Sequence, residues 1–162
     1  MTPDLYFFVP TVLIGIWVAL SDLKTMRIPN VAVIALMVAF MAIAVFTLPW
    51  DVIGTRWIQF AVVLGIGFLL TFTGQVGAGD VKYVAAMALY IDRSEISTLI
   101  FISPFIIIGA LVFHRLMKRI SFVRNRTANW QSWEENLVFP MGFTLAILFI
   151  THLYLTLGTS AA

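Results

Sequence analysis

Long apolar runs, separated by short polar links, constrain the fold of this chain more than any other feature. Five of the runs have 16 to 21 residues and cover Leu5–Leu20, Val31–Leu48, Ile58–Thr73, Leu99–Leu116 and Leu137–Leu157. A helix needs about 20 apolar residues to cross a bilayer, so these runs are typical of membrane-spanning helices. Only 11% of the 162 residues are charged, which is too little polar surface for a water-soluble domain. The sequence therefore indicates a polytopic membrane protein and excludes soluble, disordered and fibrous chains.

A further apolar run, Val81–Ile91, has only 11 residues. At roughly 1.5 Å per residue it is too short to cross about 30 Å of hydrocarbon. It is either a re-entrant segment or a helix that begins near Gly77 inside a protein-lined cavity. We favour the helix, because irregular backbone at membrane depth is tolerated where it faces protein or water. With this run included, the sequence predicts an all-α bundle of six transmembrane helices, forming a single membrane-embedded domain over residues 1–162.

The basic residues predict the orientation of this bundle. With six spans both termini lie on the same side of the membrane. If the links after the first, third and fifth spans are cytoplasmic, eight of the ten Lys and Arg residues are cytoplasmic, and only Arg56 and Arg93 are outside. The positive-inside rule therefore predicts that both termini are non-cytoplasmic. Because the basic charge concentrates in one link, His114–Arg126, it indicates topology and contact with anionic lipid, and it does not indicate nucleic acid.

The residue types that the chain lacks exclude several kinds of catalytic and metal-binding site. The chain has no cysteine, which excludes disulfides, thiolate metal sites and cysteine nucleophiles. Its two histidines, His114 and His152, are far apart in sequence and have no ligand spacing around them. We therefore expect no metal site and no organic cofactor.

Asp22 and Asp80 are the candidate catalytic residues. Each lies at the edge of an apolar run, and ionisable groups at membrane depth usually face a bundle interior or a water-filled cavity. Two carboxylates brought together share one proton, so that one can act as a base while the other acts as an acid. This is the chemistry of aspartic proteolysis, in which one carboxylate activates a water and the other polarises the scissile carbonyl.

The residues around the two acids refine this hypothesis. Gly77 and Gly79 precede Asp80 at a helix start, where glycines let an extended substrate approach the backbone. A helix N-terminus favours negative charge, so the sequence predicts that Asp80 is the resting anion and that Asp22 holds the shared proton. Lys24 and Lys82 are typical interfacial anchors, and they are also placed to hold a carboxylate or an acidic substrate side chain.

Three segments together resemble type IV prepilin peptidases, the GxGD class of intramembrane aspartic proteases. Gly77–Lys82 reads GAGDVK and is similar to the GxGDxK signature of that family. Ser21–Asn30 resembles its first catalytic segment, in which an Asp precedes Arg-x-Ile-Pro-Asn, and Phe139–Gly142 is similar to its Pro-x-Gly element. The resemblance implies that Asp22 and Asp80 are the catalytic residues. It implies that Gly77 and Gly79 form the loop that supports Asp80. Structural roles near the site are implied for Pro29, Pro140 and Gly142.

The resemblance also implies a function. Members of the family are bacterial inner-membrane endopeptidases that remove a short basic leader from prepilins or pseudopilins at the cytoplasmic face. The expected partners are therefore a prepilin substrate, the lipid bilayer and the pilus assembly machinery. Long members carry a cytoplasmic domain, often with paired cysteines, and also methylate the new N-terminus. Here the link Ser21–Asn30 is too short for that domain, so we expect a peptidase without methyltransferase activity, resembling the short enzymes of tight-adherence (Flp) pili.

Two other interpretations stay open at this point. One is a peptidase of the archaeal preflagellin type. The other belongs to a different class, a non-enzymatic membrane scaffold or a proton-coupled transporter subunit, in which the aspartates would be ion sites. Transporters of that kind often contain inverted repeats, and the sequence has no internal repeat.

Overall fold

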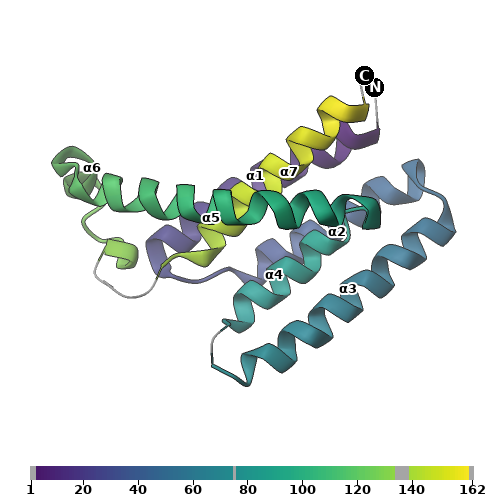
Figure 1. Ribbon diagram of the computed structural model, residues 1–162, viewed down its shortest axis with the longest axis horizontal. Coiled ribbons are helices and arrows are strands. Elements are labelled where there is room, and N and C mark those ends of the chain that lie inside the picture. The colour runs from purple at the N-terminus through teal and green to yellow at the C-terminus, as the bar shows by residue number, and fades with distance from the viewer. Residues whose placement is uncertain (1–2, 75, 134–138, 161–162) are drawn as a thin grey trace.

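The computed structural model describes residues 3–74, 76–133 and 139–160, and these residues form an all-helical protein without β-strands (Figure 1). In chain order the helices are α1 (Pro3–Thr25), α2 (Asn30–Thr47), α3 (Trp50–Thr71), α4 (Ala78–Ala88), α5 (Ile96–Arg119), α6 (Ser121–Arg126) and α7 (Met141–Ser160). Two short 3₁₀ turns, η1 (Arg93–Glu95) and η2 (Gln131–Trp133), flank α5 and α6. The predicted all-α fold class is therefore confirmed for the described residues.

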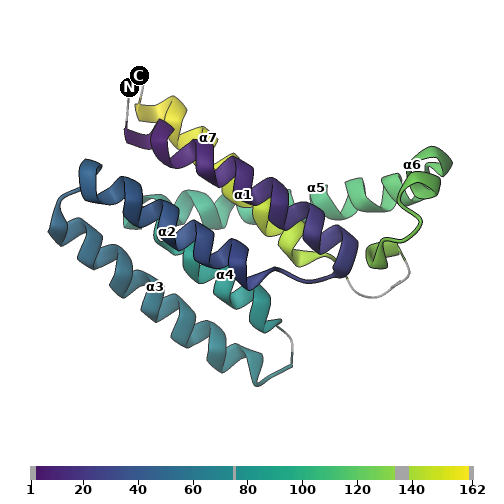
Figure 2. The same ribbon diagram turned by 180° about the vertical axis from the view of Figure 1, so that it is seen from behind.

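Five of the described helices, α1, α2, α3, α5 and α7, are long and apolar enough to cross a membrane. The chain is accordingly a multi-pass membrane protein. The predicted count of six spans is not confirmed, because α4 has only 11 residues. The beginning of α1 and the end of α7 lie side by side in both views, as expected for termini on one side of the membrane (Figures 1 and 2). Which side this is stays a prediction.

The short helix α4 lies inside the molecule. It packs against α2, α3 and α7, and most side chains from Val81 to Ile91 are buried. The neighbouring helices thus separate it from lipid, which removes the need to cross the whole bilayer. The prediction of a helix that begins near Gly77 is confirmed, since Gly77 is the N-cap of α4.

The outer helices have the opposite pattern of burial. In α3 the buried residues are Ile53 and Arg56, and in α5 they are Ala110 and His114. Most of their large apolar side chains are exposed on the protein, as expected for helices that contact lipid.

An aromatic cluster fills the core opposite these lipid-facing surfaces. The ring of Tyr90, just after α4, makes edge-to-face contacts with Phe7 of α1, Phe40 of α2 and Phe149 of α7. The Tyr90 hydroxyl donates to the carbonyl oxygen of Leu36 at 2.7 Å, so its polar end is satisfied. The end of α4 is therefore held by three helices at once.

Candidate active site

Asp22 is a buried carboxylate near the end of α1, with only 4% of its surface exposed. Its Oδ2 accepts a hydrogen bond from the backbone N–H of Phe143 at 3.1 Å. Phe143 lies in the first turn of α7, where backbone N–H groups have no partner within the helix. The N-terminal end of α7 thus provides a donor and a positive partial charge, and both stabilise the ionised form of Asp22.

Gly142 allows this close approach between α1 and α7. A Cβ at Gly142 would lie 2.9 Å from Cγ of Asp22 and 2.8 Å from Cγ1 of Ile28. Contacts that short do not occur in folded proteins, so a larger residue would push α7 away from Asp22. Pro140, also buried, precedes α7, and its carbonyl oxygen accepts a hydrogen bond from the Thr144 hydroxyl at 3.4 Å. Gly142 therefore lies directly against Asp22, and Pro140 lies two positions before it in the chain.

Asp80 is the third residue of α4 and is half-buried. Its carboxylate accepts a hydrogen bond from the backbone N–H of Gly77, the N-cap residue. A Cβ at Gly77 would lie only 2.8 Å from Oδ2 of Asp80, so the glycine makes room for the carboxylate. Asp80 lies outside the five spans. Burial, and then the charge of Asp22, raise the pKa of Asp80 to about 6, while the Gly77 hydrogen bond opposes this shift.

Both aspartates line one cavity of about 480 Å³. Its walls come from the end of α1, the α1–α2 link and the starts of α2, α4 and α7. The lining residues are Asp22, Met26, Arg27, Ile28, Asn30, Gly77, Gly79, Asp80, Lys82, Phe139 and Met141. Ile28 lies between the two acidic segments, because a Cβ at Gly79 would be in contact with its Cβ at 3.7 Å. The cavity thus brings together segments that are far apart in sequence.

The two lysines differ in their placement. Lys82 lines the cavity, and its Nζ donates to Oδ1 of Asn30 at 3.4 Å. Lys24 is exposed in the last turn of α1 and is not among the described residues that line the cavity. Pro29 is the N-cap of α2 and helps to set the direction in which that helix leaves the link. Of the two lysines, Lys82 is the better placed to contact a substrate.

Several lining residues were not singled out from the sequence. Met26 lies within the first motif, and Phe139 and Met141 lie within the last, but their spacing gave no sign that they line a cavity with Asp80. Met26 has a φ of 51°, in the left-handed region that non-glycine residues rarely adopt. Among the described residues, no three His, Cys, Asp or Glu side chains gather in a way that could hold a metal ion.

The chain matches the model of a known protein family. The model of the type IV leader peptidase family matches residues 9–113, about two thirds of the chain. The matched range contains Asp22 and Asp80 and ends before Phe139. No curated protein and no solved structure matches the chain.

Proposed function

The chain belongs to the type IV leader peptidase family, and we propose that it is an aspartic endopeptidase whose catalytic dyad is Asp22 and Asp80. Family membership makes it a peptidase of the membrane with a prepilin-type substrate. The observation that carries the finer proposal is the shared cavity, in which the charge of Asp22 helps to raise the pKa of Asp80. Two coupled carboxylates beside a cavity are the arrangement that acid–base hydrolysis of a peptide needs.

In the singly protonated dyad, we place the proton on Asp80. Burial affects both acids, so it does not distinguish them. The N–H of Phe143 stabilises the anion of Asp22, and the charge of Asp22 favours protonation of Asp80. This is the reverse of the assignment made from the sequence. That assignment considered only the helix that carries each acid, and it therefore lacked the N-terminus of α7, which faces Asp22 from another part of the chain.

Hydrolysis then follows with all atoms accounted for. Asp22 takes a proton from water as the water oxygen bonds to the scissile carbonyl carbon, and Asp80 gives its proton to the carbonyl oxygen. The resulting diol collapses, and the C–N bond breaks. The leaving nitrogen takes the proton from Asp22, and Asp80 regains one from the diol. The products are a carboxylic acid and a new amino terminus, and the dyad returns to its starting state.

The remaining parts of the proposal are the side of the membrane on which cleavage takes place, the lack of a second activity and the identity of the substrate. The positive-inside bias puts both aspartates at the cytoplasmic face of the inner membrane, where a basic leader would be cut. The link between α1 and α2 contains only residues 26–29, which leaves no room there for a cytoplasmic domain, and we propose that the enzyme lacks methyltransferase activity. The short link between α1 and α2, a feature of the short enzymes that the chain resembles, favours a Flp-type prepilin as the substrate.

A cleavage assay in membranes tests this proposal. A Flp-type prepilin is co-expressed with the wild type, Asp22→Asn, Asp80→Asn or the control Asp51→Asn, which changes an exposed acid at the start of α3. We expect the wild type and the control to shorten the prepilin on a gel, and both dyad variants to fail at equal abundance. Cleavage by either dyad variant at the wild-type rate would overturn the catalytic assignment.

The same assay separates the substrate from the mechanism. If the wild type leaves the Flp-type prepilin intact but shortens an archaeal-type preflagellin, the substrate assignment is wrong. The dyad is then tested on the preflagellin with the same variants. If the wild type cleaves neither protein, the assignment of this enzyme to Flp-type leaders is wrong.

A further inference from the structure

An apolar groove runs along the outer face of α2, next to the start of α3. Its volume is about 530 Å³, and Ile34, Met37, Val38, Met41, Val45 and Trp57 contribute to its walls. The Trp57 indole N–H donates to the sulfur of Met41 at 3.2 Å, which joins α3 to α2 at this point. Elsewhere α2 and α3 make few contacts, and α4 lies between their other ends (Figure 2). We refer to this feature as the α2 groove.

The α2 groove continues the wall of the catalytic cavity. Asn30 lines that cavity, and the groove residues follow it along α2 at positions i+4, i+7, i+8, i+11 and i+15. These spacings place all of them on one face of the helix. A single stripe of α2 therefore begins beside Lys82 and Asp80 and continues as an apolar surface toward the other end of the helix.

We propose that the α2 groove binds the apolar helix of the prepilin-type substrate, and the inference rests on the proposed function. A substrate cut at the membrane surface has a polar segment followed by a membrane-embedded helix. The cavity and the groove provide the same order, with Asp22, Asp80 and Lys82 at one end and an apolar face beyond them. A helix seated in the groove would hold the scissile bond in the cavity and so lower the entropy cost of the reaction.

The dimensions and the side chains fit a helix better than a lipid tail. From Asn30 to Val45 the stripe is about 22 Å long at roughly 1.5 Å per residue, which is enough for four helical turns. Met37 and Met41 have flexible side chains that adapt to different partners. A lipid tail would match only the apolar part, and it would leave the polar end of the stripe unused.

Site-specific crosslinking gives a direct test. A photo-crosslinking amino acid is placed at Val38 in the groove or at Val62 of α3, which is similarly exposed and does not line the groove. We expect the prepilin to crosslink several-fold more at position 38 than at position 62. Equal yields at the two positions, adducts only with lipid, or adducts only between two copies of the enzyme would overturn the proposal.

Steady-state kinetics of a groove variant test the groove proposal separately from the catalytic proposal. Ala42→Trp places a large side chain on an exposed position of the groove, and Val62→Trp is its control. We expect Ala42→Trp to raise KM several-fold while kcat changes little. If Ala42→Trp cleaves like the wild type while Asp80→Asn stays inactive, the groove proposal fails and the catalytic proposal stands. If no variant cleaves, the crosslinking ratio still decides whether the groove binds substrate.

Discussion

The two ends of α4 carry acidic residues in opposite settings. At its start, Asp80 and the neighbouring Asp22 line an open cavity, and no described Lys or Arg forms an ion pair with either of them. Beyond its end, Asp92 forms an ion pair with Arg56 of α3, with Oδ2 and Nη2 2.8 Å apart. Arg56 also donates to the carbonyl oxygen of Ile91, and so does Gln59 at 3.1 Å.

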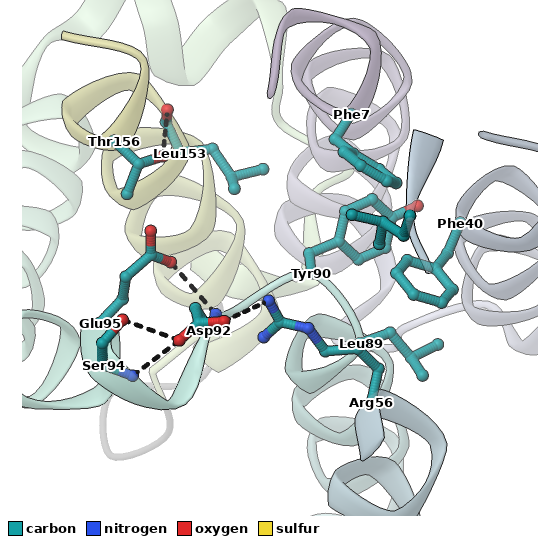
Figure 3. A pocket seen from close by; sticks show the side chains of 11 residues that line it. Phe7, Phe40, Arg56, Leu89, Tyr90, Asp92, Ser94, Glu95, Leu153 and Thr156 are labelled. Atoms are coloured by element: carbon teal, nitrogen blue, oxygen red, sulfur yellow. Dashed lines mark hydrogen bonds and ion pairs between the residues drawn. The ribbon is translucent and has the colours of Figure 1, made fainter. Parts of the chain in front are cut away.

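The group of paired charges around Asp92 extends to the start of α5 and to α7. Asp92 accepts hydrogen bonds from the N–H and the hydroxyl of Ser94, which together with Arg56 hold the pKa of Asp92 below its usual value. Glu95 accepts a hydrogen bond from the N–H of Asp92 (Figure 3). The same carboxylate lies 3.3 Å from Nε2 of the buried His152. The charges at this end are satisfied by one another, so they fix helices in place. The acids at the other end lack such charged partners, as the proposed catalytic dyad requires.

The largest expected effect is the difference in cleavage rate between Asp80→Asn and Asp92→Asn. Asp80→Asn removes the general acid, and we expect the cleavage rate to fall at least about 100-fold. Asp92→Asn can keep the hydrogen bonds from Ser94 through its amide oxygen and loses the ion pair with Arg56. Because Asp92 does not line the cavity, the cleavage rate should stay within a few-fold of the wild type. Initial rates at matched abundance in membranes provide the measurement. A loss of equal size in both variants would contradict the distinction between a reactive and a structural end.

The next effect concerns the glycine beside Asp22. Gly142→Ala should push the N-terminus of α7 away from Asp22, and we expect the rate to fall about 10- to 100-fold while insertion is retained. Gly158→Ala in the same helix is a matched control, because a Cβ there meets nothing within 4 Å. Rates and membrane abundance are measured for both. Similar rates for the two variants would show that close contact at Gly142 is not needed.

The next prediction concerns the dependence of the cleavage rate on pH. The pKa of Asp80 is raised to about 6, so its acid form is lost as the pH rises through 6. We expect kcat/KM to fall about tenfold per pH unit above that point, because the active dyad needs this proton. A profile of initial rates from pH 5 to pH 8 measures this, and a rate that rises above pH 6 would contradict the placement of the proton on Asp80.

The smallest expected effect concerns the structural end. Arg56→Ala leaves the carbonyl oxygen of Ile91 with fewer donors and Asp92 without its cation, and we expect a loss of about 1–3 kcal/mol in the free energy of unfolding. The exposed Arg93→Ala is the control. Thermal unfolding in a fixed detergent measures both variants, and cleavage per folded molecule should change little. An unchanged Tm for Arg56→Ala would show that the cluster does not stabilise the fold.

Local features of the sequence predicted most of the fold. The long apolar runs identified the five long helices, and the shortness of one run together with Gly77 indicated the start of α4. Relations between distant residues could not be predicted in the same way. Arg56 and Asp92 are 36 positions apart, and each resembles an ordinary topology marker when it is considered alone. The N–H that reaches Asp22 comes from 121 positions away, so the sequence alone could not include it in the choice of which acid holds the shared proton.

The hydrogen bond between α1 and α7 has a consequence for biosynthesis. The ribosome makes Asp22 before Phe143, so the nascent chain carries this acid without its hydrogen-bond donor until the start of α7 has been made. The environment of Asp22 is completed only when α7 docks against α1. A nascent chain that stalls before Met141 therefore lacks the contact that holds the Asp22 side chain in place.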